Sequence, residues 1–357
     1  NRWLTPLGRT LPNGQLLGKA ECLERVPGLD PAGLHGGVIF HDGQMESSER
    51  MSLAFVEGAA SQGAALGNYV RAVNFIREGG RIAGVEAEDR FTGDRLAIRA
   101  RVVVNTAGPW SDLLVRPLRG DDSRTVRLSK GFQIITPQLT GDLGLAVVSR
   151  HQDPDAVLHR GGRHYFITPW REASVVGNTD TLYEGDPDHW CITESEIAGF
   201  IAEVNSAFPA AALTRENVRH VYGGLQAVDP RRVNRGAQVA KQHRIIDHEK
   251  DLKLKGLLTV IGVKYTGCRW LAEKIVDRVC GKLGYKVIPC STRRAPLVGG
   301  SIGSVEELAA KVRADAPDGA TGPVQRHVAR QYGTRYSRIF KLMRDEPELA
   351  ACLPGSD

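Results

Sequence analysis

The stretch RVVVNTAGPWSD at residues 101–112 decides the fold that we expect for this chain. Its apolar run at 102–104 is typical of a parallel strand that is covered on both faces. Gly-Pro at 108–109 ends the run, and Ser111 or Asp112 is available to cap a following helix. Such a turn predicts a seat for an anionic or hydrogen-bonding cofactor, because its backbone N–H groups lie at the positive end of the helix. A plain structural turn is the competing interpretation.

A second stretch, LLTVIG at 257–262, repeats this order of apolar run and turn. It continues into VKYTGC at 263–268 and then into a helical pattern that ends at Gly284. Because both stretches have the same strand, turn and helix order, we expect the two turns to meet around one ligand. The apolar positions of the helical pattern are Leu271, Ile275, Val279 and Leu283.

The residues before position 101 predict the second half of a dinucleotide-binding domain. A helix is expected over 48–62, with a serine available as its cap. Strands are expected over 69–75, 81–88 and 96–100, and a turn-like Thr-Gly-Asp separates the last two. A helix, a strand, a short antiparallel excursion and the valine run form the order found in such a domain.

From about residue 125 the pattern changes to short strands that are joined by polar loops. The strands are KGFQIITP at 130–137, GLAVVS at 144–149, RHYFITPW at 163–170 and SVVGNTD at 174–180. Their close spacing predicts an antiparallel sheet, and therefore a second domain. One helix interrupts this region, with a capping-box pattern and an apolar stripe, at Thr193, Glu196, Ile197, Ile201, Val204 and Phe208.

The sequence after Pro296 is expected to be helical. Ser304 and Glu307 form a capping-box pattern, and further helices are predicted over 324–331 and 334–343. A solvated face explains the basic residues of these helices, and contact with acidic lipid or a partner is the alternative. Those residues are Arg326, Arg330, Arg335, Arg338, Lys341 and Arg344.

Composition and charge narrow the function classes. The chain has 357 residues, 41% hydrophobic and 25% charged, with a formal net charge of +6, which would favour a phosphorylated substrate or an acidic membrane surface. Its basic residues are dispersed and match no nucleic-acid-binding motif, so no nucleic acid partner is expected. The six cysteines form no C-x-x-C pair, which favours free thiols in a reducing compartment and no metal site.

Five segments, in order and at similar separations, resemble the FAD-dependent glycerol-3-phosphate dehydrogenase family of the D-amino-acid-oxidase-like flavoproteins. They are VVVNTAGPWSD at 102–112, LSKGFQIITP at 128–137, RHYFITPW at 163–170, VVGNTDTLYEGDPD at 175–188 and VIGVKYTGCRWLAEKIVD at 260–277. The resemblance implies an α/β fold with an incomplete FAD-binding, Rossmann-like domain, an antiparallel-sheet substrate domain and a C-terminal helical segment. The corresponding ranges are 1–120 with 250–295, 121–249 and 296–357.

The resemblance also implies a set of cofactor contacts. It places Val73 near the adenine through backbone groups, and it places Thr106, Ala107 and Gly108 beside the ribityl and phosphate region. The flavin ring would lie by Gly262, Val263, Lys264, Tyr265 and Thr266. Lys264 is the expected catalytic residue, because an ammonium there can stabilise negative charge on the reduced flavin or bind a substrate oxygen. An ordinary surface lysine is the competing interpretation.

Two positions depart from the family pattern. Gln133 stands where the family typically has a histidine in K-G-x-H, and Gln226 stands where it has an arginine in G-x-R-P. Glutamine cannot act as a base near neutral pH or pair bidentately with an anion. Either the catalytic base and the anion clamp lie in the missing N-terminal part, or this subfamily acts on another substrate. Gln133 and Gln226 stay candidate substrate contacts, and Arg163 is a further candidate anion contact, with a solvated strand-edge arginine as its alternative.

Members of the family begin with a strand, a G-x-G-x-x-G turn and a helix that hold the pyrophosphate, and this sequence contains no such turn. We therefore expect roughly the first hundred residues of the family pattern to be missing, and the helical domain to be cut short near Asp357.

The leading functional hypothesis is oxidation of sn-glycerol 3-phosphate to dihydroxyacetone phosphate by hydride transfer to FAD, with electrons passing to quinone or oxygen. An amine or 2-hydroxy-acid oxidase of the same superfamily is the second hypothesis, and an FAD-free, inactive fragment or interaction module is the third. The expected location is the cytoplasm or the cytoplasmic face of the membrane, with peripheral membrane contact as an open alternative. No apolar run approaches the ~20 residues of a membrane span.

Overall fold

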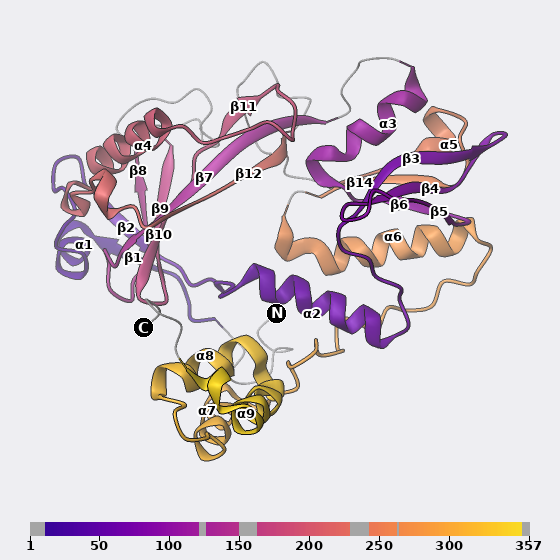
Figure 1. Cartoon of the computed structure of the whole chain (residues 1–357). Coiled ribbons are helices and arrows are strands. Elements are labelled where there is room, and N and C mark those ends of the chain that lie inside the picture. Colours follow the sequence, from indigo (N-terminus) through magenta and orange to yellow (C-terminus); the bar gives the residue numbers. More distant parts are fainter. Residues whose placement is uncertain (1–10, 121–125, 150–162, 229–242, 263, 352–357) are drawn as a thin grey trace. The chain divides into compact units, whose positions relative to one another are not determined.

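A computed structural model describes residues 11–120, 126–149, 163–228, 243–262 and 264–351. The chain divides into two compact units (Figure 1). The first unit comprises Asn1–Gly43 and Val70–Val287, and the second comprises Gln44–Tyr69 and Ile288–Asp357.

A small sheet with the order β13-β14-β6 contains both of the strands that the sequence placed before a ligand turn. β14 (Leu257–Ile261) pairs in parallel with β6 (Val103–Asn105), whereas β13 (Arg244–Asp247) pairs with β14 in the antiparallel sense. Every residue of β14 is buried, as its uninterrupted apolar run predicted. The parallel pairing confirms that the two strand and turn units lie side by side.

The turns after these strands lead into helices. A 3-10 turn, η2 (Gly108–Trp110), precedes α3 (Ser111–Arg119), and η6 (Tyr265–Gly267) precedes α6 (Cys268–Lys282). The expected cap at Ser111 or Asp112 is wrong. The N-cap position is Trp110, whose φ of −87° and ψ of −3° are helical and whose side chain makes no capping hydrogen bond. The helix continues directly from the 3-10 turn, so no extended residue is left to act as a side-chain cap.

An antiparallel excursion lies beside this sheet, with the order β3-β4-β5. It contains β3 (Val70–Glu78), β4 (Arg81–Asp89) and β5 (Arg95–Arg99), close to the predicted ranges. Its core joins it to α3 and β14 through Phe75, Ile82, Val115 and Leu257.

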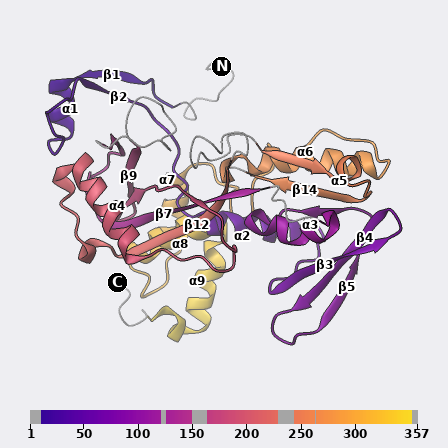
Figure 2. The ribbon, with the colours of Figure 1, turned by 90° about the horizontal axis from the view of Figure 1, so that it is seen from above.

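The second sheet is antiparallel throughout, as its short strands predicted. Its order is β11-β7-β10-β9-β8, and β12 pairs along β7 as well. Figure 2 shows β7 and β12 running side by side. The strands are β7 (Arg127–Pro137), β8 (Leu145–Val148), β9 (His164–Trp170), β10 (Ala173–Gly177), β11 (Thr181–Tyr183) and β12 (His220–Val228).

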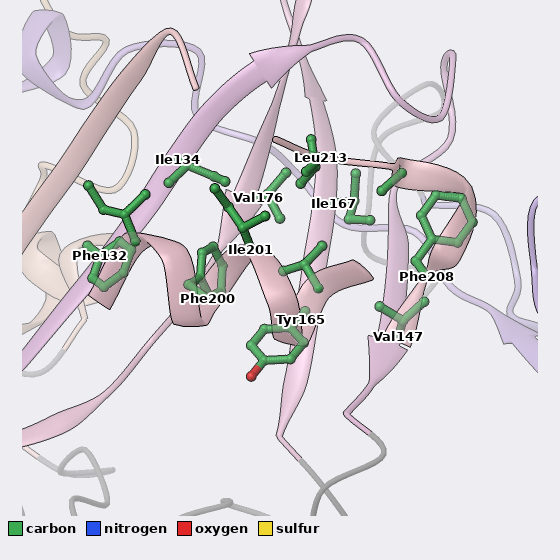
Figure 3. Packing of buried hydrophobic residues seen from close by; sticks show 13 residues of the cluster. Phe132, Ile134, Val147, Tyr165, Ile167, Val176, Phe200, Ile201, Phe208 and Leu213 are labelled. Atoms are coloured by element: carbon green, nitrogen blue, oxygen red, sulfur yellow. The ribbon is translucent and has the colours of Figure 1, made fainter. Parts of the chain in front are cut away.

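Helix α4 (Glu194–Ala207) covers one face of this sheet. Thr193 and Glu196 form the predicted capping box, and Ile197, Ile201 and Val204 are buried. Figure 3 shows their neighbours interdigitating with the inward side chains of the strands. The core they form contains Phe132, Ile134, Val147, Tyr165, Ile167, Val176, Phe200, Phe208 and Leu213. The opposite face of the sheet carries the exposed side chains that are considered below.

The first unit also contains several shorter elements. They are β1 (Gln15–Gly18), α1 (Lys19–Arg25), β2 (Gly36–Ile39), α5 (His248–Asp251), η3 (Pro209–Ala211) and η4 (Arg215–Asn217).

The second unit joins the predicted helix near residue 50 to the C-terminal helices. The Arg50 side chain donates from Nε to the carbonyl of Gln331 at 2.8 Å and stacks over the Tyr332 ring. Ser47 caps the first helix, as expected. The helices are α2 (Ser48–Ser61), α7 (Val305–Ala314), α8 (Gly322–Tyr332), η7 (Gly333–Arg335), α9 (Tyr336–Asp345) and η8 (Pro347–Ala350).

Several of the basic residues predicted in α8 and α9 are engaged within this unit. Arg330 pairs with Glu46 at 3.5 Å, and Arg335 pairs with Glu57. Lys341 pairs with Asp345, and Arg344 donates to a backbone carbonyl. Ion pairing within the unit therefore accounts for much of this charge.

Candidate functional site

The first turn is shaped by Asn105, the last residue of β6. Its buried side chain accepts a hydrogen bond from the N–H of Ala107 at 3.1 Å and donates one to the carbonyl of Ser111 at 3.1 Å. Gly108 has φ +56°, a left-handed conformation that favours glycine. The turn therefore holds one shape, with Thr106 and Ala107 exposed and Gly108 half-buried.

A buried polar chain connects the two parallel strands beneath the turns. Asn105 Nδ2 lies 3.4 Å from Thr259 Oγ1, and that hydroxyl lies 2.8 Å from His248 Nε2. Burial lowers the pKa of His248 below its ordinary value, so this imidazole is neutral at neutral pH. Each member of the chain finds a partner, as buried polar groups generally require.

The second turn presents its predicted residues to solvent. Gly262, Lys264, Tyr265 and Thr266 are exposed, and the Tyr265 residue is 41% accessible. The Lys264 ammonium forms no hydrogen bond or ion pair with the described residues. Val263 lies outside the described residues.

Beyond the second turn, Arg269 pairs with Glu273 along α6 at 2.9 Å. The arginine that matched the family pattern is therefore engaged within its own helix.

Val73 lies at an irregularity of β3. The register with β4 shifts between Ala72 and Asn74, so Val73 is the extra residue of a β-bulge. A bulged residue is left out of the regular ladder of backbone hydrogen bonds. The backbone position implied for adenine contact is thus one where strand pairing is interrupted.

The open face of the second sheet carries both unusual glutamines. Gln133 lies opposite Tyr222 on β12, and Gln226 lies opposite Ser129 on β7. Side chains alternate between faces along a strand, so Gln133, Tyr222 and Gln226 share the face away from α4. The Gln133 stem lies over Gly177, where an added Cβ would approach it to 2.5 Å.

Gln226 and Arg163 converge on Asp180, in the loop after β10. Gln226 Nε2 donates to Asp180 Oδ1, and Asn178 Nδ2 donates to Oδ2 at 3.2 Å. Arg163 Nη2 donates to the Asp180 carbonyl at 3.0 Å. The structure therefore brings two of the three predicted substrate residues together, whereas Gln133 lies further along the sheet.

The Gln226 end of the sheet is the end that meets β14. The residues on either side of it, Leu225 and Ala227, pack against Ile261, the last residue of β14. Gln226 itself points to the other face. The turn that carries Lys264 begins directly after Ile261. The predicted cofactor turn therefore follows the strand end that packs near the Gln226 end of β12.

On the α4 face of the sheet, an ion pair joins Lys130 of β7 to Glu196 of α4. Lys130 Nζ lies 2.5 Å from Glu196 Oε1 and donates to the carbonyl of Cys191 at 3.0 Å. Burial acts to raise the pKa of Glu196, but hydrogen bonds from Lys130 and Thr193 outweigh it and lower that pKa. Lys130 is thereby held away from the open face.

Sequence reasoning missed Tyr222 and Gly224, which lie on the open face beside Gln226. The period-two alternation of His220, Tyr222, Gly224 and Gln226 was the available signal. It became informative only once β12 was known to be a strand paired with β7.

Comparison with known proteins gives a family match over most of the chain. Residues 2–267 match the family DAO, described as FAD dependent oxidoreductase. The chain is 30% identical to the glycerol-3-phosphate dehydrogenase of Synechocystis sp. over 96% of its own length and 62% of that protein. It is 26% identical to the aerobic glycerol-3-phosphate dehydrogenase of Staphylococcus epidermidis, over 95% of this chain and 60% of that protein. The chain thus spans about three fifths of these relatives.

Solved structures agree with this match. The crystal structure of the glycerol-3-phosphate dehydrogenase from Bacillus halodurans complexed with FAD is 27% identical, with a TM-score of 0.76 over 94% of this chain and 63% of that one. Glycine oxidase from Geobacillus kaustophilus, at 18% identity and a TM-score of 0.50, shares the fold.

Proposed function

Because the chain belongs to the FAD-dependent oxidoreductase family, we propose that it forms part of an enzyme that oxidises sn-glycerol 3-phosphate to dihydroxyacetone phosphate. The observation that carries the proposal is the likeness to proteins named glycerol-3-phosphate dehydrogenase, which runs through both sheets and the C-terminal helices. We assign three parts to this function: 1–120 with 250–295 bind cofactor, 121–249 bind substrate, and 296–357 form a helical segment.

The described residues fit the ring side of an FAD molecule. Thr106 is exposed in a turn fixed by Asn105, where the Ala107 N–H and carbonyl are already bonded within the turn, and Gly108 has no side chain to obstruct approach. Gly262, Tyr265 and Thr266 are exposed on the adjacent turn. In this proposal, Thr106, Ala107 and Gly108 lie beside the ribityl and phosphate region, and the residues of the second turn lie by the flavin ring.

When bound, FAD supplies a two-electron acceptor for the hydride that leaves the substrate carbon. In this proposal, Lys264 holds a positive charge beside the reacting groups, where it stabilises developing negative charge. Gln133 and Gln226 orient the substrate by hydrogen bonds. Neither amide takes up the hydroxyl proton, because a glutamine side chain is not a base near neutral pH.

Electrons are proposed to pass from the enzyme to quinone or oxygen, in the cytoplasm or at the cytoplasmic face of the membrane. None of the described helices has the length and apolarity that crossing a bilayer requires. Peripheral contact through the basic residues of α8 and α9 is an alternative that vesicle binding would test.

A flavin absorption measurement tests the proposal. The purified protein is mixed with FAD, separated from free cofactor, and titrated anaerobically with sn-glycerol 3-phosphate, a 2-hydroxy acid or glycine. Retained FAD that is bleached by sn-glycerol 3-phosphate supports the proposal. Bleaching only by glycine or the 2-hydroxy acid would assign an oxidase of another substrate class, and a colourless protein would refute FAD binding.

A further inference from the structure

Four residues on the open face of the second sheet form a surface that we call the Gly224 patch: Gln133, Tyr222, Gly224 and Gln226. Gly224 lies between Tyr222 and Gln226 along β12, and opposite Gly131 on β7. A Cβ added at Gly224 would meet no atom within 4 Å, so open space stands above it. The Tyr222 residue beside it is 45% exposed.

The Gln226 amide has one orientation in this patch. An ionised carboxylate only accepts hydrogen bonds, so the group that Gln226 points at Asp180 must be its NH₂. Asn178 contributes a second donor to the same carboxylate. The amide is therefore held from one side, with its oxygen directed elsewhere.

The amide oxygen of Gln226 is the group left for a ligand. No described residue donates a hydrogen bond to it. An acceptor attracts the O–H of a hydroxyl group, whereas a phosphate or carboxylate oxygen presents no proton to it. Gln226 is half-buried; Gln133 adds a second neutral amide on the same face, which is exposed and lies about 13 Å away along the strands at 3.3 Å per residue.

We propose that the Gly224 patch binds the uncharged, hydroxyl-bearing part of the substrate, with Gln226 Oε1 accepting a hydrogen bond from a substrate hydroxyl. The inference rests on the proposed function in taking this face as the substrate face. It adds that any anionic group of the substrate is bound outside the patch. Gln226 is thus a specificity-determining residue that selects a hydroxyl.

Ligand-observed NMR titrations of the FAD-loaded protein test this proposal, with glycerol as the neutral probe and inorganic phosphate as the anionic probe. Gln226→Leu removes the acceptor and should weaken glycerol binding by about 2- to 10-fold, the usual worth of one neutral hydrogen bond. Phosphate binding should not change. Gln138→Leu is the matched control, because Gln138 lies beyond the end of β7 and donates to the Gly141 carbonyl.

A second variant keeps the test independent of the Asp180 contact. Gly224→Val places methyl groups in the open space above the patch, and the backbone there is not left-handed. It should fold with an unchanged melting temperature and still lose glycerol binding by 10-fold or more.

Three results would overturn the proposal: absence of glycerol binding to the unmodified protein, equal binding by both variants and the parent, or loss of phosphate binding in Gln226→Leu. The proposed function is judged separately, by bleaching of FAD with sn-glycerol 3-phosphate. If the protein binds glycerol through Gln226 but sn-glycerol 3-phosphate does not bleach its FAD, this inference stands and the proposed reaction is refuted.

Discussion

Lys264 and Asn105 show how single residues of opposite burial serve the same pair of turns. Asn105 is buried and uses its amide to fix the first turn and to reach Thr259. Lys264 is exposed on the second turn. In the proposed site, Asn105 would fix the first turn while Lys264 supplies the charge on the second, so that these groups need not reorganise during the reaction.

We expect Lys264→Ala to slow reduction of bound FAD by substrate by about 100-fold, because it removes a charge that stabilises the transition state. Stopped-flow absorbance under anaerobic conditions measures the rate. Lys286→Ala removes an equally exposed lysine outside the site and should leave the rate unchanged. Equal rates in the parent and both variants would show that Lys264 is an ordinary surface lysine with no part in flavin reduction.

The buried imidazole of His248 should make stability depend on pH. Its pKa in the folded state lies below the unfolded value of 6.5, so the folded state binds fewer protons. The stabilisation is fully present above about pH 6.5 and declines as the pH falls toward the folded pKa. His248→Gln replaces the imidazole by a neutral amide that can still hydrogen-bond Thr259, and it removes the titration.

Urea unfolding at pH 7.5, 6.5 and 5.5 checks this expectation. The parent should lose more unfolding free energy on acidification than His248→Gln, while the two remain close in stability at pH 7.5. Identical slopes with pH would show that His248 does not contribute.

At the scale of elements, α4 supports the open face of the sheet from behind. In its capping box, the Glu196 N–H donates to Thr193 Oγ1 at 3.3 Å, and the Thr193 N–H donates to Glu196 Oε2 at 2.8 Å. Phe200 packs edge-on to both Phe132 and Tyr165. The helix therefore fixes the strands whose other face carries Gln133, Tyr222 and Gln226.

Thr193→Ala should lower the unfolding free energy by about 1 kcal/mol, because it leaves the N–H of Glu196 without its side-chain acceptor. Thr193→Ser keeps the hydroxyl and should restore most of that loss. Chemical denaturation with circular dichroism compares the three proteins. A serine variant as unstable as the alanine variant would locate the effect in packing of the threonine methyl group.

At the scale of the whole molecule, the chain forms two units with separate cores. The first contains Ile134 between β7 and α4, and the second contains Phe340 among α7 to α9. Hydrogen bonds from Arg50 and Arg335 bring α2 into the second unit, across more than 270 residues of sequence. The Arg335 hydrogen bond lowers the pKa of Glu57, so the carboxylate stays ionised and the pair persists to lower pH than an ordinary glutamate would allow.

Two cores should give two thermal transitions in differential scanning calorimetry. Phe340→Ala is expected to cost about 3–5 kcal/mol and to lower only one transition, and Ile134→Ala should cost about 2–5 kcal/mol and lower the other. A single transition that both substitutions shift together would show instead that the units unfold as one.

Local patterns predicted most elements, including the parallel strands, the short antiparallel strands and the α4 capping box. They failed at Ser111 and Asp112, because the 3-10 turn before α3 replaced the extended cap. They also left Tyr222 and Gly224 unnoticed, since their position beside Gln226 depends on the register of β12.

The sequence by itself determined the strands, turns and helices, because backbone preferences and hydrophobic periodicity act over a few neighbouring residues. The tertiary structure decided which polar groups meet. Asn105 reaches Thr259 across 154 residues, and Gln226 reaches Asp180 across 46. Such contacts follow from strand order and register, which depend on the packing of whole sheets and which no local pattern specifies.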